Sequence, residues 1–172
     1  GRAHAHKLAR EQGRFEAVTF VSFGEGLTTT GTFHEAMMLA SALSLPIVML
    51  CRTQLWPEGG PMEAGLVGDG ATERAKACGL WARKVDGADP LATVAQVTTA
   101  AERARAGRGP AFVECVVTQL VHDPPPQRDP LEVLRRHLDR EGQWTQTFQD
   151  VLEADIRREL DQACAELGLA PR

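Results

Sequence analysis

The amino-acid sequence predicts an α/β fold: a doubly wound, mostly parallel sheet followed by C-terminal helices. Short, mostly apolar segments alternate along the chain with segments of helical periodicity, as in a parallel sheet covered by helices. Within the apolar segments, polar and apolar residues do not alternate, which is typical of strands buried on both faces. The order β-α-β-α-β-α-β implies right-handed crossovers and helices on both faces of one sheet.

The boundaries of these elements follow from apolar runs, helical spacing and capping residues. Asp89 followed by Pro90 is a typical helix start, and Gly79 is a typical residue after a helix end. Asp69, between two glycines, is interpreted as the N-cap of a short helix. The predicted strands are 17–23, 46–51, 81–85 and 111–117, and the predicted helices between them are 32–43, 72–78 and 90–106.

The two ends of the chain are predicted to lie outside this sheet. Three successive prolines at 124–126 forbid helix and make 122–130 an extended connector. The predicted α/β domain therefore covers 1–121, and 131–172 forms a helical segment with helices 131–141 and 145–167. The chain has no initiator Met and opens inside a predicted helix, which indicates a fragment or one part of a larger chain.

Composition narrows the function classes. The chain has 172 residues, of which 43% are hydrophobic and 24% charged, which suits one globular domain with a substantial core. A net charge of -4 does not indicate a nucleic-acid-binding face. No apolar stretch approaches the roughly 20 residues of a membrane span. The four cysteines are scattered without a C-x-x-C pair, which favours a reduced, cytoplasmic setting.

Polar residues follow three of the predicted strands. Glu25, flanked by glycines, follows the first strand, Thr53-Gln54 follows the second, and His122 comes a few residues after the fourth. In open parallel sheets, ligands bind beyond the carboxyl ends of the strands. Carboxylate and amide oxygens suit Mg²⁺ together with phosphate oxygens. The sequence therefore predicts a site for a divalent cation and a diphosphate at this edge.

These residues also have simpler interpretations. Gly24-Glu25-Gly26 by itself is a weak motif, and the simpler interpretation is a turn that carries a solvated carboxylate. The threonines 28–30 either bind phosphate or cap the next helix. The apolar stripe of the helix 145–167 indicates packing on the body of the protein or on a partner.

Several motifs resemble one family along nearly the whole chain. The chain resembles the α subunit of the dehydrogenase (E1) component of thiamine-diphosphate-dependent 2-oxoacid dehydrogenases. The glycine-flanked Glu25 and the dipeptide Cys51-Arg52 look closest to the branched-chain 2-oxoacid member. The segments that carry the resemblance are 21–26, 33–36, 45–52, 83–91, 104–115 and 129–138.

The resemblance implies a fold, a reaction, cofactors and partners. It implies the thiamine-diphosphate-binding fold and decarboxylation of a 2-oxoacid with acyl transfer to a lipoyl domain. The implied partners are a β subunit and the lipoyl-bearing acyltransferase, with no nucleic acid and no membrane. The implied catalytic residue is His122, and the implied Mg²⁺ ligands are Glu25, Gln54 and the carbonyl of Trp56. The residues implied to bind thiamine diphosphate are Gly24, Glu25, Gly26, Leu27 and Gln54.

This sequence departs from the family pattern near the implied site. The family's Asn-Asn is Thr53-Gln54 here, its Tyr is Trp56, and its catalytic His aligns with Asp123 unless the alignment shifts by one residue to His122. A second hypothesis is therefore a degenerate, non-catalytic paralogue that acts as an assembly or regulatory subunit. A third is a generic nucleotide-binding α/β module, although no phosphate loop of the usual spacing is present.

Overall fold

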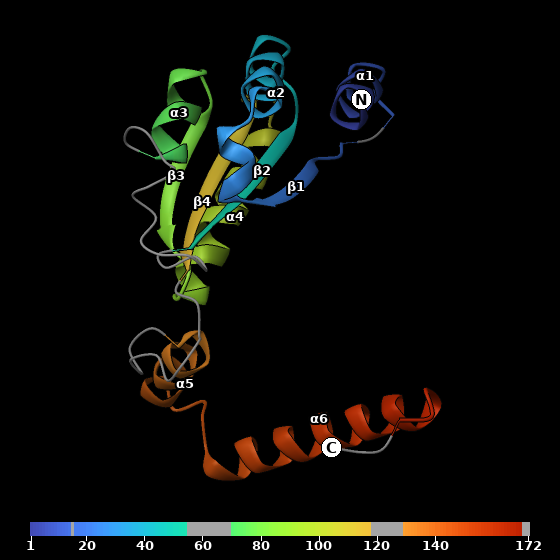
Figure 1. Ribbon diagram of the computed structural model, residues 1–172, viewed down its shortest axis with the longest axis vertical. Coiled ribbons are helices and arrows are strands. Elements are labelled where there is room, and N and C mark those ends of the chain that lie inside the picture. Colours follow the sequence, from blue (N-terminus) through green and yellow to red (C-terminus); the bar gives the residue numbers. More distant parts are fainter. Residues whose placement is uncertain (15, 55–69, 118–128, 170–172) are drawn as a thin grey trace. The chain divides into compact units, whose positions relative to one another are not determined.

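The structure is a computed structural model that describes residues 1–14, 16–54, 70–117 and 129–169 (Figure 1). Its elements are α1 (Arg2–Glu11), β1 (Thr19–Gly24), the 3₁₀ helix η1 (Glu25–Thr29), α2 (Gly31–Ala42), β2 (Ile47–Gln54), α3 (Ala71–Ala77), β3 (Trp81–Asp86), α4 (Pro90–Arg105), β4 (Ala111–Val117), α5 (Pro130–Arg140) and α6 (Gln146–Glu166).

The four strands form one parallel sheet in the order β1-β2-β4-β3 (Figure 1). The two central strands, β2 and β4, pair from Val48 with Ala111 through to Gln54 with Val117. Each strand returns to the sheet through a helix, because parallel neighbours need a crossover connection. The prediction of an α/β fold with a parallel sheet is confirmed.

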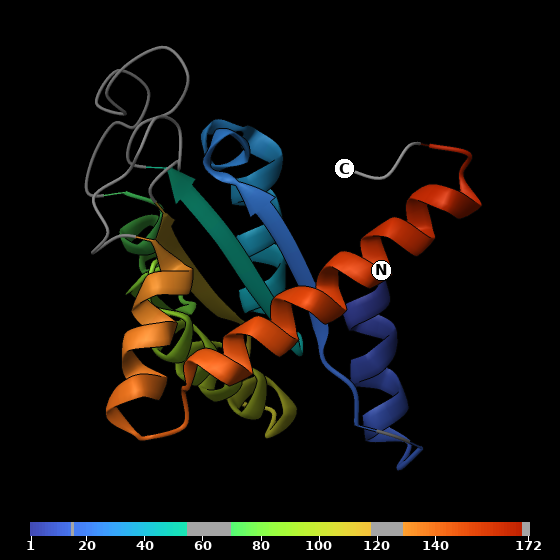
Figure 2. The same cartoon turned by 90° about the horizontal axis from the view of Figure 1, so that it is seen from below.

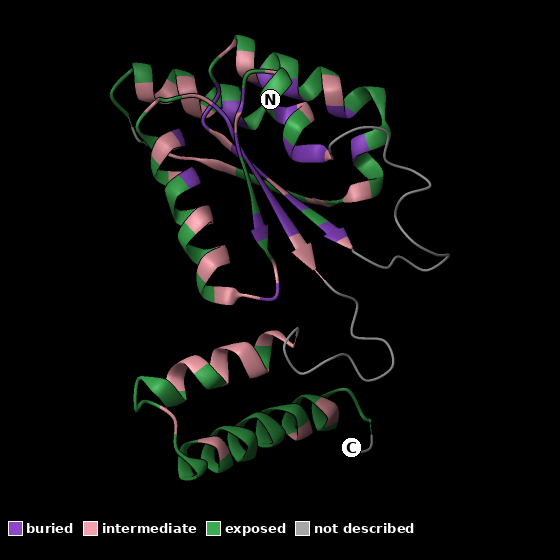
Figure 3. Cartoon of the chain, turned by 90° about the vertical axis from the view of Figure 1, so that its left-hand side faces the viewer, coloured by how far each residue is buried: buried purple, intermediate pink, exposed green. Residues whose placement is uncertain are grey.

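Helices cover both faces of the sheet, as a doubly wound fold requires. On β4, Phe112 packs on one face with Met37 of α2 and Ala75 of α3. Its neighbour Val113 points to the other face and packs with Ala104 of α4. Successive side chains of a strand point to opposite faces, so one apolar run supplies two cores. Figure 3 shows the buried residues gathered in the strands and on the inner sides of these helices.

The edge strand β1 differs from the prediction that all strands are buried on both faces. Phe20 is 52% exposed and Val21 is 39% exposed, whereas most of β4 is buried. β1 pairs with β2 on one side only, among the residues that the structure describes (Figure 2). An apolar strand sequence cannot by itself distinguish a central strand from an edge strand.

The strand β2 is longer than predicted. The sequence places its end at Cys51 because Arg52 interrupts the apolar run, but the strand continues to Gln54. Pairing with β4 carries it on, since Thr53 pairs with Val116 and Gln54 with Val117. Thr53 and Gln54 are therefore inside the strand at its carboxyl end and do not follow it.

The chain divides into two compact units, 1–130 and 131–172. The second unit holds α5 and α6, and Thr145 caps α6 by accepting a hydrogen bond from the Phe148 amide at 3.1 Å. Much of the apolar stripe on α6 is exposed, including Ile156 at 49% and Leu160 at 61%. No helix in the described ranges has the length and apolar character needed to span a membrane. The predicted connector 122–130 lies mainly outside the described residues.

Candidate functional site

The carboxyl ends of β1 and β2 lie side by side, as the predicted site requires. Gly24, the last residue of β1, pairs with Arg52 of β2, and Gln54 ends β2 two residues further on. Glu25 follows Gly24 directly and is the half-buried first residue of η1. The fold thus brings the Glu25 carboxylate and the Gln54 amide to the same edge of the sheet.

The two glycines beside Glu25 leave open space. Gly24 has an ordinary extended backbone with φ -86° and ψ 166°. A Cβ atom at Gly24 or at Gly26 would have no atom of the described residues within 4 Å. The turn therefore does not need glycine for its own conformation, and what the two glycines provide is room beside the Glu25 backbone.

The three threonines of the following turn bind the local backbone. The Thr28 hydroxyl donates to the Glu25 carbonyl at 2.6 Å, and the Thr29 hydroxyl donates to the Gly26 carbonyl at 3.0 Å. The Thr30 hydroxyl accepts from the Phe33 amide at 3.3 Å and caps α2. The capping interpretation is confirmed for Thr30, and the bonds of Thr28 and Thr29 hold η1 in shape.

Thr53 and Gln54 have different surroundings because they alternate across the sheet. Thr53 is 1% exposed and lies on the same face as Cys51, whose Sγ is 3.8 Å from the Thr53 Oγ1. Gln54 is half-buried and starts from the opposite face. Of the two residues that replace the family's Asn-Asn pair, Thr53 is part of the core and Gln54 is accessible.

Glu114 on β4 is a buried residue that sequence reasoning missed. It is 1% exposed, and its Oε1 accepts a hydrogen bond from the Thr53 hydroxyl at 3.0 Å. Its Oε2 accepts from the Thr72 amide at 3.0 Å and from the Thr72 hydroxyl in a short contact. A buried carboxylate needs such donors. Glu114 therefore joins the end of β2 to the first turn of α3.

This contact also corrects the predicted start of α3. The N-cap position is Gly70, with no side-chain capping bond, so it is not Asp69, which lies outside the described residues. The free amide of Thr72 is satisfied by Glu114, from a strand 42 residues later in the chain. No local pattern could have revealed this cap.

Arg74 of α3 is a second residue that the sequence did not reveal. Its Nη2 donates to the Thr28 hydroxyl at 3.1 Å, which places the guanidinium beside the turn that carries Glu25. Its Nε is buried and has no hydrogen-bond partner among the residues that the structure describes. The guanidinium brings a positive charge to this edge, which suits a phosphate group.

The buried Cys51 thiol near this edge has a raised pKa. Burial raises the pKa of Cys51 to about 11, and the Glu114 and Glu25 carboxylates add to the rise. Burial also raises the pKa of the Cys115 thiol. Both thiols are therefore protonated at neutral pH and are not nucleophiles.

The donors at this edge fit Mg²⁺ by type but form an incomplete set. Glu25 and Gln54 offer oxygen atoms, which Mg²⁺ prefers, and its remaining ligands are commonly phosphate oxygens and water. No group of three His, Cys, Asp or Glu side chains that could hold a metal occurs within the described ranges. Trp56 and His122, the other predicted site residues, lie outside them.

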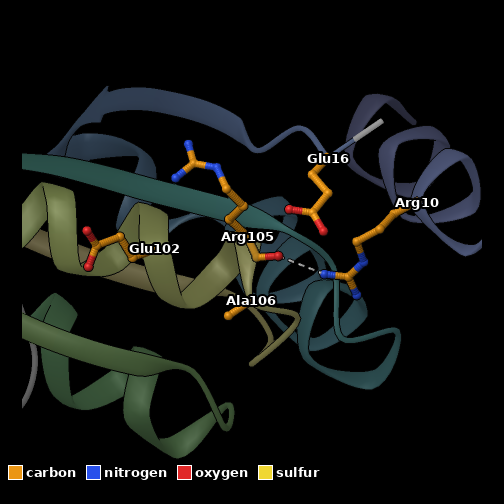
Figure 4. A pocket seen from close by; sticks show the side chains of 5 residues that line it. All are labelled: Arg10, Glu16, Glu102, Arg105 and Ala106. Atoms are coloured by element: carbon orange, nitrogen blue, oxygen red, sulfur yellow. Dashed lines mark hydrogen bonds between the residues drawn. The ribbon is translucent and has the colours of Figure 1, made fainter. Parts of the chain in front are cut away.

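A separate hollow lies at the opposite, amino-terminal side of the sheet (Figure 4). It is lined by Arg10, Glu16, Glu102, Arg105 and Ala106. The Arg10 Nη1 donates to the Arg105 carbonyl at 3.1 Å, at the C-terminal end of α4. Gly107 has φ +74°, and a Cβ there would lie 2.7 Å from the Arg10 Nη2. Arg10 therefore serves as a cap for α4 from α1.

Comparisons with known proteins decide the family. The model of the family described as "Dehydrogenase E1 component" matches residues 1–171. The chain belongs to the dehydrogenase E1 component family. It is 28% identical to a pyruvate dehydrogenase E1 component subunit alpha of Bacillus cereus, over 91% of this chain and 46% of that protein. It is 30% identical to a 3-methyl-2-oxobutanoate dehydrogenase subunit alpha of Mycobacterium tuberculosis, over 86% of this chain and 46% of that protein.

Against these E1 alpha subunits the chain spans about half their length. Relatives named for pyruvate and for a branched-chain 2-oxoacid match at similar identity, so identity does not separate the two substrates. Among solved structures, a transketolase variant from Pichia stipitis superposes with a TM-score of 0.49 at 22% identity, over 58% of this chain and 15% of that one. The predicted resemblance to an E1 alpha subunit is confirmed.

Proposed function

We propose that this chain is part of the α subunit of a 2-oxoacid dehydrogenase and helps to bind thiamine diphosphate through Mg²⁺. The family match over residues 1–171 carries the proposal. The placement of Glu25 beside the end of β2 supports it, because the carboxyl edge of a parallel sheet is where ligands bind.

The described residues would hold the cofactor by its diphosphate. Glu25 and Gln54 would each give one oxygen to Mg²⁺, together with the Trp56 carbonyl. The Arg74 guanidinium, held by Thr28 beside Glu25, would neutralise a phosphate oxygen. Gly24, Gly26 and Leu27 would let the cofactor approach the main chain, because no side chain in the described part of the chain fills the space beside the two glycines.

The cofactor, when bound, supplies the electron sink for decarboxylation of the 2-oxoacid. The protein supplies binding, orientation and exclusion of water, and His122 would contact the diphosphate or assist acyl transfer. A branched-chain 2-oxoacid is the proposed substrate, supported by the glycine-flanked Glu25 and by Cys51-Arg52. The proposed partners are an E1 β subunit and the lipoyl-bearing acyltransferase, in a cytoplasmic setting.

The alternative is a non-catalytic paralogue that keeps the fold and the partner surface. The observation that favours it is the replacement of Asn-Asn by Thr53-Gln54. Against it, Thr53 is buried and its hydroxyl donates a hydrogen bond to Glu114 inside the core. The replacement of the first Asn by Thr53 is therefore explained by packing. Of that pair, only Gln54 is then an altered ligand, and its amide oxygen is retained on a side chain one methylene longer.

The test is calorimetric titration of thiamine diphosphate with Mg²⁺ into the chain, alone and with a candidate β subunit. We expect binding that needs Mg²⁺ and is tighter with the partner. Glu25→Gln should weaken binding at least about tenfold, because a charged metal ligand is lost. Gln54→Asn should tighten it, because the shorter amide suits octahedral geometry better.

The matched control is Glu35→Gln, which removes the same charge from an exposed position on α2. It should leave the affinity unchanged. Absence of binding both with and without the partner would favour the non-catalytic paralogue. Equal binding by the Glu25→Gln variant would remove Glu25 from the proposed metal site.

A further inference from the structure

A cluster of arginines surrounds Trp81 at the amino end of β3. The Arg83 Cζ is 4.8 Å from the centre of the Trp81 ring, and the Arg103 Cζ is 5.2 Å from it. Trp81 and Arg83 are two residues apart on β3 and therefore lie on the same face of the sheet, the face that α4 covers. Arg103 lies in the last turn of α4. Guanidinium groups at these distances are attracted by the ring face. With Arg108 we call these four residues the Trp81 cluster.

The arginines of the Trp81 cluster form no ion pair with any residue that the structure describes. Arg83, Arg103 and Arg108 take part in none of the ion pairs between described residues. The Arg83 Nη1 donates a hydrogen bond to the adjacent Ala82 carbonyl at 3.0 Å. Glu102 is the one acidic residue that lines the same hollow in the described part of the chain, so its lining side chains carry a net positive charge.

The hollow beside the cluster has the size of a small-molecule site. Its volume is about 510 Å³, within the range of roughly 300–1,000 Å³ that such ligands occupy. Gln96 and Thr99 of α4 add polar side chains to its wall. The full lining is Trp81, Arg83, Gln96, Thr99, Glu102, Arg103, Ala106 and Arg108.

Stabilisation of a helix end does not explain the whole cluster. Arg103 lies in the last turn of α4, where a cation complements the helix dipole. Arg83 comes from β3, and Arg108 comes from the segment between α4 and β4. Three segments therefore bring positive charge to one aromatic ring. Arginine side chains bind carboxylate and phosphate groups through bidentate hydrogen bonds.

We propose that the Trp81 cluster binds a small organic molecule that carries two or more oxyanion charges, as phosphate or carboxylate groups. The site is separate from the proposed cofactor site. Trp81 opens β3 at the amino end of the sheet, whereas Glu25 follows the carboxyl end of β1. The two sites therefore lie at opposite ends of parallel strands.

The test uses Trp81 as its own reporter. Trp56 and Trp144 are replaced by Phe, which leaves Trp81 as the sole tryptophan of the chain. Its fluorescence is followed during titration with inorganic pyrophosphate or with citrate, at low ionic strength and after divalent cations have been removed with a chelating resin. Without Mg²⁺, metal-dependent binding at the proposed cofactor site does not contribute.

We expect a saturable change with one binding site for at least one probe. The tighter probe identifies the oxyanion, pyrophosphate for a phosphate ligand and citrate for a carboxylate ligand. Arg103→Gln should weaken binding at least about tenfold, since a charge-assisted hydrogen bond is lost. Arg108→Gln, at an exposed position, should weaken it in the same direction and gives a variant with little effect on folding.

Two controls separate the site from general charge effects. Arg158→Gln makes the same change on α6, and Arg74→Gln makes it at the proposed cofactor site; both should keep the affinity. No saturable change with either probe would overturn the proposal. An equal loss of affinity in the Arg103, Arg108 and Arg158 variants would overturn it as well, because it would show unspecific attraction.

Discussion

At the scale of the residue, Glu114 is the most informative side chain of the structure. Its two carboxylate oxygens accept hydrogen bonds from Thr53 and Thr72. These residues lie at the end of β2 and the start of α3, so one buried carboxylate fixes two elements. The position of Gln54, the next residue after Thr53, depends on this contact.

Replacement of Glu114 by Ala should lower the free energy of unfolding by about 2–4 kcal/mol. The change leaves the Thr53 and Thr72 donors without acceptors and opens a cavity in the core. Urea unfolding measures the difference. Glu35→Ala on the exposed side of α2 is the control and should change stability by no more than about 0.5 kcal/mol. A loss no larger than that of the control would show that the Glu114 contacts are not formed.

The Cys51 thiol makes stability depend on alkaline pH. Its pKa is raised by burial from 9.0 to about 11, so the folded state holds the proton more tightly than the unfolded state. The stability is fully present below pH 9 and is lost as the pH rises towards 11. The loss amounts to about 1.4 kcal/mol per pH unit for this group.

Urea unfolding across this range should show the decline, with a further contribution from Cys115, whose pKa is also raised. The chain has no tyrosine that would titrate in the same window. A Cys51→Ala variant should show a shallower decline. The same slope in both proteins would contradict a raised pKa at Cys51.

At the scale of the element, α4 has a start that the sequence specifies in full. The Asp89 Oδ1 accepts hydrogen bonds from the Leu91 and Ala92 amides, each at 3.0 Å. Pro90 occupies the first helical turn, where its missing N–H costs nothing. The predicted N-cap is therefore confirmed.

Asp89→Ala should destabilise the protein by about 1 kcal/mol, because two amides at the helix start lose their acceptor. Thermal unfolding measures the change. Asp89→Asn keeps the acceptor oxygen and should restore most of the loss. Failure of Asn to restore stability would mean that charge near the helix start, and not the cap bond, matters at this position.

The strands show where element prediction is limited. β1 and β4 have similar apolar sequences, yet β1 is an edge strand with Phe20 exposed and β4 is central. β2 extends past Arg52 because β4 continues to pair with it as far as Gln54, whereas the pairing with β1 ends at Arg52. The strand order, which the local sequence does not contain, decides both properties.

At the scale of the whole molecule, α6 presents an exposed apolar stripe that includes Phe148, Ile156 and Leu160. We expect the chain to associate as its concentration rises, because exposed apolar patches of this kind promote contacts. Replacing Ile156 and Leu160 by Ser should reduce the association in light scattering. Gln149→Ser on the same helix is the control. A monomer at high concentration would contradict the prediction.

The molecule also shows how far the site follows from sequence. The edge at which Glu25 and Gln54 lie was predictable, because the apolar runs indicated both strands and the carboxyl ends of parallel strands meet at the same edge. The roles of Arg74 and Glu114 were not, since each acts on residues more than 40 positions away. The Trp81 cluster likewise combines β3 with the far end of α4.

The sequence by itself determined the fold class, the order of helices and strands, the cap at Asp89 and the family, because these depend on local periodicity and motifs. The tertiary structure decided which strands lie at the edges, where β2 ends, and which polar side chains from distant elements contact one another. The physical reason is that strand pairing and burial join residues far apart in the chain. Local propensity carries no information about such partners, and their contacts complete the candidate site.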